Sequence, residues 1–412
     1  MTTTSAAGAP RDGGADAPAT TLIHHGYVPP PGFAAIPPAV HKASTVLFDS
    51  VAALRAHSWL EKTSYSYGLH GTPTTFTLEA RLATLEGGTH ALLAPSGLAA
   101  LALVNQSLLS SGDAVLIPDN VYAPNRNLAL HELARWGIAH RVYDPMRPQS
   151  LHEQLGPDVA LVWVKAPGSV TLEFPDLCAL VRTVRAQAPR AVVAMDNTWG
   201  CGIAYDAFDL APGAAPLGAD LTIHALTKYP SGGGDLLMGS VVTRSQKLYE
   251  QLALTHSRLG LGVGANDVEF VLRGLPTLAL RYAAQDAAGR RIAQWALGRP
   301  EFARVLHPAM PGSPGHEHWV RQCRAAAGLV TLEFDPAYAA ERVEAFVDDL
   351  RLFGIGWSWG GPMSLAVPYR PEALRGPGTA YRGTLVRLCI GLEAVDDLVA
   401  DLERALRTLG AP

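Results

Sequence analysis

This sequence has few cysteines, a small net charge and no long apolar runs. Each of these features excludes some classes of protein. The four cysteines are far apart and lack the spacing of a metal site, which predicts reduced thiols in a cytoplasmic protein. The formal net charge of −4 provides no basic surface for nucleic acid or an anionic membrane. No apolar run is long enough to span a bilayer, and the start of the sequence lacks the pattern of a secretory signal.

Two kinds of binding motif are also absent. No G-x-G-x-x-G fingerprint opens the first helix, which argues against a nicotinamide enzyme. The stretch His316-Glu317-His318 lacks the spacing of a helical zinc-protease motif, so we expect no metal site. With 412 residues, of which 48% are hydrophobic and 17% charged, the chain is typical of a globular protein with one large and one small domain.

The domain organisation follows from local composition. Residues 1 to about 20 are rich in Ala, Gly, Thr and Pro, which predicts disorder, and five prolines between residues 28 and 38 favour an extended arm. We expect residues 1–75 to form this disordered start and an N-terminal arm that contacts a neighbouring subunit. Residues 76–265 are predicted to form a large domain that binds a cofactor, and residues 266–412 a C-terminal domain.

Short apolar runs alternate with helical segments in the predicted large domain. Runs of this kind, without polar alternation, suit strands buried on both faces, so we predict a three-layer α/β fold with a mostly parallel sheet. We expect a long helix near residues 269–295 to lead into a smaller α+β region. The six runs are residues 91–95, 114–118, 159–164, 191–195, 221–224 and 237–242.

Groups that could bind a ligand follow the ends of these predicted strands. Gly97 and Leu98 open an apolar helix, where free amides can cradle a phosphate, although an ordinary strand-to-helix turn has the same pattern. Asp196 ends a buried strand. It either caps the following turn or faces a cation, and a protonated pyridine nitrogen would be such a cation.

Lys228 is the candidate nucleophile. It follows an apolar run and lies between Thr227 and the glycines of Gly232-Gly233-Gly234, which would let a ligand come close. Most lysines are solvated, but a desolvated lysine loses its proton more easily and becomes a competent amine nucleophile. A strand-end aspartate, a later strand-end lysine and a helix-opening glycine together indicate a cofactor site.

A family resemblance rests on motifs spread from about residue 20 to the C-terminus. The chain resembles bacterial cystathionine β-lyases, in the Cys/Met-metabolism branch of fold-type I pyridoxal 5′-phosphate (PLP) enzymes. Pro-Gly-Ser favours the β-lyase group, because γ-synthases and γ-lyases usually have Thr-Asn-Pro there. The matching stretches are Phe48-Asp49-Ser50-Val51, Thr84-Leu85-Glu86-Gly87-Gly88, Pro167-Gly168-Ser169, Asp196-Asn197-Thr198-Trp199, Thr227-Lys228-Tyr229, His307-Pro308-Ala309, Ser358-Trp359-Gly360-Gly361 and Gly383-Thr384-Leu385-Val386-Arg387-Leu388.

The resemblance implies a role for each candidate cofactor residue. Lys228 would hold the PLP aldehyde as a Schiff base and move protons, and Tyr122 would stack on the ring as the second catalytic residue. Asp196 would pair with the pyridine nitrogen. The remaining contacts would be to the phosphate: the amides of Gly97 and Leu98, the hydroxyl of Thr227, and Tyr67 reaching across from the adjacent subunit.

The resemblance also implies a substrate site and a reaction. Arg387 would clasp the substrate α-carboxylate bidentately with help from Ser358, and Tyr67 and Trp357 would complete the site. The implied reaction cleaves L-cystathionine or a related cysteine S-conjugate to a thiol, pyruvate and ammonia. The alternatives are γ-elimination, γ-replacement or another amino-acid transformation, as in secondary metabolism, or a catalytically idle homologue. Relatives are homotetramers built as dimers of dimers.

The chain departs from the family pattern at several positions that line the implied site. Leu69 and Ala225 stand where an arginine and a serine usually contact phosphate. Lys165 stands where the family has glutamate, and Trp357 replaces a tyrosine. The family's Gly-His-Ser-Asp is here Gly232-Gly233-Gly234-Asp235.

We therefore expect Leu69→Arg to tighten PLP binding. A charge-assisted hydrogen bond contributes roughly 1.5–3 kcal/mol, which corresponds to about ten-fold or more in the dissociation constant. Equilibrium dialysis of PLP measures the change, with Leu69→Met as the size-matched control. An unchanged dissociation constant in the arginine variant would contradict this placement of Leu69.

Overall fold

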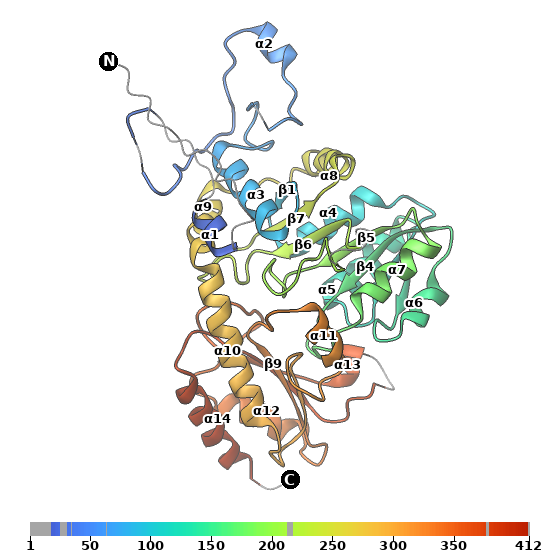
Figure 1. Cartoon of the computed structure of the whole chain (residues 1–412), viewed down its shortest axis with the longest axis vertical. Coiled ribbons are helices and arrows are strands. Elements are labelled where there is room, and N and C mark those ends of the chain that lie inside the picture. The colour runs from blue at the N-terminus through green and yellow to red at the C-terminus, as the bar shows by residue number, and fades with distance from the viewer. Residues whose placement is uncertain are drawn as a thin grey trace.

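The computed structural model describes residues 18–24, 31–33, 35–62, 64–211, 217–375 and 379–410. Most of the start predicted to be disordered lies outside the described residues, as does part of the proline-rich segment. The first described element is α1 (Pro18–Ile23). The short helix α2 (Val51–Ala56) buries none of its residues and projects from the body of the molecule (Figure 1).

A seven-stranded sheet forms the centre of the larger part of the molecule. Its order is β1-β7-β6-β5-β4-β2-β3, and β7 runs antiparallel to both neighbours while the others pair in parallel. The predicted fold class, with a mostly parallel sheet between helical layers, is confirmed. The strands are β1 (His90–Ala94), β2 (Ala114–Pro118), β3 (Ala139–Tyr143), β4 (Val159–Lys165), β5 (Val192–Asp196), β6 (Leu221–Ala225) and β7 (Gly239–Thr243).

Successive residues of the central strands alternate between two apolar layers. Val162 and Val164 of β4 pack in the layer of α3 (Pro73–Glu86) and α7 (Leu177–Gln187). Leu161 and Trp163 pack in the layer of α4 (Gly97–Leu108) and α8 (Gln246–Leu259). Burial on both faces explains the apolar runs without alternation. In the layer of α3 and α7, α6 (Pro148–Gln154) lies beside α7. In the layer of α4 and α8 lie α5 (Ala123–Asn127) and the π-helix η1 (Leu128–Leu133).

Two elements differ from the expectations drawn from the sequence. β3 was not among the predicted strands, because at the sheet edge only its last residue is buried and it has no apolar run. The single helix expected over residues 269–295 is divided into α9 (Ala265–Gly274) and α10 (Leu278–Ala296) by the 3-10 turn η2 (Leu275–Thr277). Pro276 lies in that turn and has no N–H to continue a helical ladder.

The C-terminal part contains a five-stranded sheet of order β10-β11-β12-β9-β8. α10 runs from the upper helices down to this sheet, which it covers together with α12 and α14 (Figure 1). No helix among the described residues is long and apolar enough to cross a membrane. The elements are β8 (Phe302–Leu306), α11 (His316–Gln322), β9 (Leu329–Phe334), α12 (Ala340–Asp349), β10 (Gly354–Ile355), β11 (Leu365–Tyr369), α13 (Pro371–Arg375), β12 (Leu385–Cys389) and α14 (Val395–Leu409).

Arg375 of α13 joins the C-terminal part to the larger sheet. Its Nη1 lies 2.7 Å from Oδ1 of Asp119, just after β2, and its Nη2 pairs with Glu173 and Thr171 beyond β4. The side chains of Arg375 and Glu173 are 9% and 7% exposed. A buried ion pair of this kind fixes two units against each other, because separating them would strand a charge out of water.

Arg375→Met should lower the free energy of unfolding by about 3 kcal/mol, since removing one partner leaves buried carboxylate charge uncompensated. Arg370→Met is the matched control, because Arg370 makes only exposed ion pairs with Glu341 and Glu344 and should change stability by less than about 1 kcal/mol. Urea titrations at one fixed protein concentration measure both. Equal losses in the two variants would show that Arg375 has no special structural role.

Candidate active site

The carboxyl ends of β4, β5 and β6 bring the candidate residues to one edge of the large sheet. Lys165 and Asp196 end their strands and are direct partners in the parallel register. Ala194, two residues before Asp196, packs in the layer of α4, so Asp196 points to that same face. The turn that follows β6 carries Lys228.

Lys228 lies in a largely desolvated position. Its Nζ donates to Oγ of Ser358 at 2.9 Å and lies 5.5 Å from the ring centroid of Trp359. Burial, and then the nearby positive charge of Arg387, lower the pKa of Lys228 to about 8. A sizeable fraction of this amine is therefore neutral, and thus nucleophilic, near physiological pH.

Asp196 is the buried anion of the site. Its Oδ2 accepts from Nζ of Lys165 at 2.8 Å and its Oδ1 accepts from the backbone N–H of Thr198 at 3.1 Å. Burial opposes ionisation, but the charge and hydrogen bond of Lys165 outweigh it and hold the pKa of Asp196 below its ordinary value. Tyr122 precedes α5 and interacts electrostatically with this carboxylate: burial, and then the Asp196 charge, raise the pKa of its phenol.

The start of α4 lies against the segment that leads to Lys228. Ser96 caps the helix by accepting from the N–H of Ala99 at 3.0 Å, and the amides of Gly97 and Leu98 in the first turn have no helical carbonyl to bind. A Cβ at Gly97 would lie 2.6 Å from Cβ of Ala225, so only glycine permits this approach. The hydroxyl of Thr227 lies 3.3 Å from the backbone nitrogen of Met238.

Arg387 of β12 reaches the site from the smaller sheet. Its Nη2 donates to the backbone oxygen of Ser358 at 3.4 Å, and its guanidinium lies 5.6 Å from the ring centroid of Tyr369. Its Nε is buried and has no hydrogen-bond partner in the described part of the chain. Ser358 therefore contacts both Arg387 and Lys228, whereas the neighbouring Trp357 is 84% exposed.

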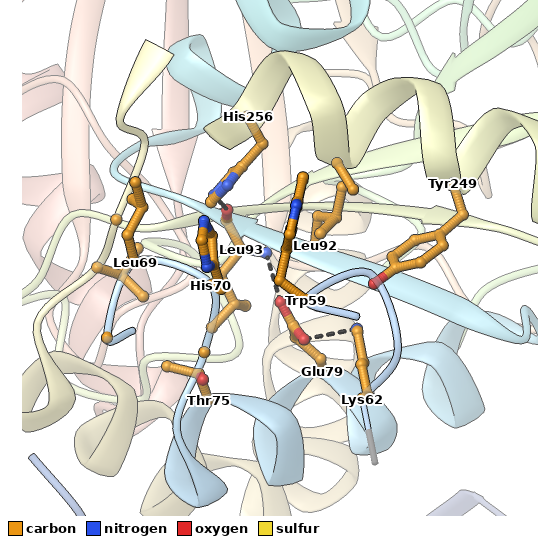
Figure 2. Close-up of a pocket in the computed structure, with 15 residues that line it drawn as sticks. Trp59, Lys62, Leu69, His70, Thr75, Glu79, Leu92, Leu93, Tyr249 and His256 are labelled. Carbon is orange, nitrogen blue, oxygen red and sulfur yellow. Dashed lines mark hydrogen bonds and ion pairs between the residues drawn. The ribbon is translucent and has the colours of Figure 1, made fainter. Parts of the chain in front are cut away.

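Tyr67 is not joined to this group by the contacts within one chain. Tyr67 forms an isolated antiparallel β-bridge with Thr45, and its hydroxyl lies 3.5 Å from Oγ of Ser44. Leu69 and His70 line a small cavity of about 30 Å³ that Lys228, Asp196 and Arg387 do not line (Figure 2). The action of Tyr67 on an adjacent subunit therefore stays a prediction.

His70 is held within its own chain. Its ring nitrogens lie 3.1 Å from Oγ of Ser66 and 3.2 Å from Oγ of Ser257, and the ring stacks on Trp59 with centroids 4.6 Å apart. Both nitrogens are thus already engaged. The histidine next to Leu69 does not replace the missing arginine without breaking one of these contacts.

A second buried network anchors the turn after Asp196 from the opposite face of the sheet. Oε2 of Glu86 accepts from Nδ2 of Asn197 at 2.6 Å, and Oε1 of Glu86 lies 2.9 Å from Nδ1 of His224. Burial lowers the pKa of His224, but Cys201 and Glu86 beside the ring raise it to about 10. The charged pair fixes Asn197, and with it the position of the adjacent carboxylate.

Reasoning from the sequence missed the contacts of two residues. In the sequence, Lys165 stands out only as a departure from the family pattern, and Trp359 only as part of a matching stretch. A lysine that ends an otherwise apolar strand was a usable signal, because a charge at such a position needs a partner. No comparable signal marked Trp359, whose approach to Lys228 depends on how the two sheets are placed.

Comparison with known proteins places this site in a family. A family model described as Cys/Met metabolism PLP-dependent enzyme matches residues 19–407. The chain belongs to this family.

Relatives of this Cys/Met metabolism enzyme share its length and fold. It is 34% identical to cystathionine beta-lyase MetC of Escherichia coli (strain K12), over 93% of this chain and 96% of that protein. It is 38% identical to cystathionine beta-lyase of Bordetella avium, over 94% and 96%. A crystal structure of cystathionine gamma synthase from Xanthomonas oryzae pv. oryzae in complex with cystathionine superposes with a TM-score of 0.85 at 28% identity, covering 96% of this chain and 99% of that one.

PLP is the cofactor of this family, and the residues present fit it. Lys228 offers a partly neutral amine for the aldehyde, and Asp196 offers a buried carboxylate for the pyridine nitrogen. The free amides that open α4 suit a phosphate, and the close approach at Gly97 leaves them unobstructed by a side chain. Within the described residues no cluster of three or more His, Cys, Asp or Glu side chains is placed to hold a metal ion.

The lowered pKa of Lys228 predicts selective chemistry in the cofactor-free protein. At pH 7.5 a pKa of about 8 leaves roughly a quarter of the amine neutral, against about 0.1% for an ordinary lysine. Reductive methylation of Lys228 should therefore be half-maximal near pH 8, as read by peptide mass spectrometry. Exposed Lys247 of α8 serves as the reference in the same digest. Superimposable pH profiles for the two lysines would contradict the desolvated position of Lys228.

Proposed function

We propose that this enzyme is a PLP-dependent carbon–sulfur β-lyase that cleaves L-cystathionine or a related cysteine S-conjugate to a thiol, pyruvate and ammonia. The observation that carries the proposal is the position of Lys228, whose desolvated amine shares Ser358 with Arg387. This arrangement puts a base next to a carboxylate-binding guanidinium. The relatives from Escherichia coli and Bordetella avium, both named cystathionine beta-lyase, support the choice of reaction.

Arg387 is the proposed anchor of the substrate α-carboxylate. A guanidinium binds a carboxylate bidentately, and the Nε of Arg387 is buried without a partner in the described residues, so a ligand oxygen would satisfy it. Ser358, held between Arg387 and Lys228, would orient the bound substrate. A substrate anchored there would present its Cα–H to the amine of Lys228.

Lys228 is the proposed proton carrier. PLP, when bound, supplies the electron sink that makes the Cα proton of an amino acid acidic. Lys228 would take that proton and deliver it to the departing sulfur, a role suited to an amine with a pKa of about 8. Tyr122, which precedes α5, would cover the cofactor ring and exclude water from this side.

The remaining contacts proposed for the site involve the phosphate and a neighbouring subunit. The amides of Gly97 and Leu98, with the hydroxyl of Thr227, would hold the phosphate, and Tyr67 would reach it from a second chain. The segment with α2, which precedes Tyr67 in the chain, projects from the body of the molecule, as an arm reaching a neighbour would (Figure 1). We propose a homotetramer built from dimers, in the cytoplasm, with Trp357 near the substrate entrance.

The second candidate function is γ-elimination or γ-replacement. The structural similarity to cystathionine gamma synthase supports considering it. Product identity separates the two reactions. With L-cystathionine we expect pyruvate and homocysteine, detected by mass spectrometry, rather than 2-oxobutyrate and cysteine. 2-Oxobutyrate as the main product would replace the β-lyase proposal with γ-elimination.

Lys228→Ala is the control for this experiment. It should lower pyruvate formation at least about a thousand-fold, because the variant lacks the proton carrier. Borohydride reduction of the wild-type protein with PLP should label the peptide that contains Lys228. Wild-type turnover without this label would mean that another residue holds the cofactor.

A further inference from the structure

Lys165 and Asp196 form a buried ion pair at the place assigned to the cofactor's pyridine nitrogen. The two residues end adjacent parallel strands, their side chains are each 8% exposed, and Nζ of Lys165 lies 2.8 Å from Oδ2 of Asp196. A charge buried this deeply requires a partner. In the described residues Nζ of Lys165 makes no other hydrogen bond, so the ammonium depends on Asp196.

The carboxylate of Asp196 has enough acceptor positions to keep this pair while it also binds a cofactor. Its Oδ1 accepts from the N–H of Thr198 and its Oδ2 from Lys165. An ionised carboxylate offers about four acceptor positions, so two remain for a pyridine N–H. Moving Lys165 away would strand its ammonium in the protein, which is strongly unfavourable.

Sharing Asp196 changes what the carboxylate does to the cofactor. A carboxylate keeps a pyridine nitrogen protonated because its negative charge stabilises the pyridinium cation. The Lys165 ammonium compensates part of that charge at a distance where Coulomb interactions in a protein are strong.

We propose that Lys165 is a positioning residue that acts through Asp196 to lower the proton occupancy of the PLP pyridine nitrogen and so weaken the electron sink. This inference rests on the proposed function, since it requires PLP to be bound with Lys228 and Asp196. A weaker electron sink withdraws less electron density from Cα. Removal of the Cα proton then depends more strongly on Lys228 as the base.

The test is the ¹⁵N chemical shift of the pyridine nitrogen in enzyme loaded with ¹⁵N-labelled PLP. The shift separates protonated from neutral pyridine and does not depend on turnover. In the wild-type enzyme we expect a value displaced from the protonated limit toward the neutral limit. In Lys165→Gln, which keeps a polar side chain but removes the charge, we expect the signal to move toward the protonated limit.

Lys62→Gln is the matched control, because Lys62 forms an ion pair with Glu79 in the cavity of Figure 2, which Asp196 does not line. It should leave the wild-type shift unchanged. Identical shifts in wild type and Lys165→Gln would overturn the proposal. If Lys165→Gln does not fold, the wild-type spectrum decides alone, and a signal at the protonated limit overturns it.

Borohydride labelling of the same wild-type sample separates this inference from the proposed function. If the peptide containing Lys228 is unlabelled, the proposed function fails and Lys165 has no assigned cofactor to act on. If Lys228 is labelled and Lys165→Gln leaves the shift unchanged, only the inference about Lys165 fails.

Discussion

Charge compensation in a desolvated pocket is the constraint on which this site depends. At the carboxyl edge of the large sheet, Lys165 pairs with the buried carboxylate of Asp196, and the next turn holds Lys228, with Arg387 of the smaller sheet near it. Cations of this kind cannot all keep their full charge out of water. Lys165 meets the requirement by pairing with Asp196, and Lys228 meets it by giving up its proton more readily, which is the property that a nucleophilic amine needs.

The sheet keeps this chemistry on one face by strand periodicity. Neighbouring residues of a strand point to opposite faces, so Asp196 lies on the side of α4 while Asn197 begins the turn tied to Glu86 and His224 on the other side. The ionic network behind the sheet thus holds the backbone from which Asp196 projects. Arg375 also holds the site together, at longer range. Its ion pairs with Asp119 and Glu173 fix the C-terminal part, which brings Arg387 to the site.

Much of the fold could be predicted from the sequence, since strands buried on both faces are continuous apolar runs. Six strands of the large sheet are recovered in this way, and β3 is not, because an exposed edge strand has no such signature. Pro276 was visible in the sequence, but whether it ends a helix or merely kinks it depends on the packing around it. The family itself, its cofactor and the central strand ends were all readable from motifs.

The site was predictable to the extent that it consists of strand ends. Asp196 and the Lys228 turn belong to parallel neighbours, so their meeting follows from topology. The contact of Trp359 with Lys228 and the approach of Arg387 depend on how two separate sheets pack, which no local pattern specifies. Contacts made by a second chain, as expected for Tyr67, lie beyond what the fold of one chain determines.

The departures from the family pattern would all weaken the electrostatic binding of the cofactor. With the site proposed here, Leu69 and Ala225 would leave the phosphate without two polar contacts, and His70 is engaged by Ser66 and Ser257 rather than free to substitute. Lys165, paired with Asp196, would reduce the charge that this carboxylate offers to the ring nitrogen. Each change would take electrostatic stabilisation away from one end of the cofactor, so a larger share of its retention would fall on the proposed covalent link to Lys228. A site arranged in this way would hold PLP firmly only while that link is intact, and would release it more readily whenever a substrate amine displaces the lysine.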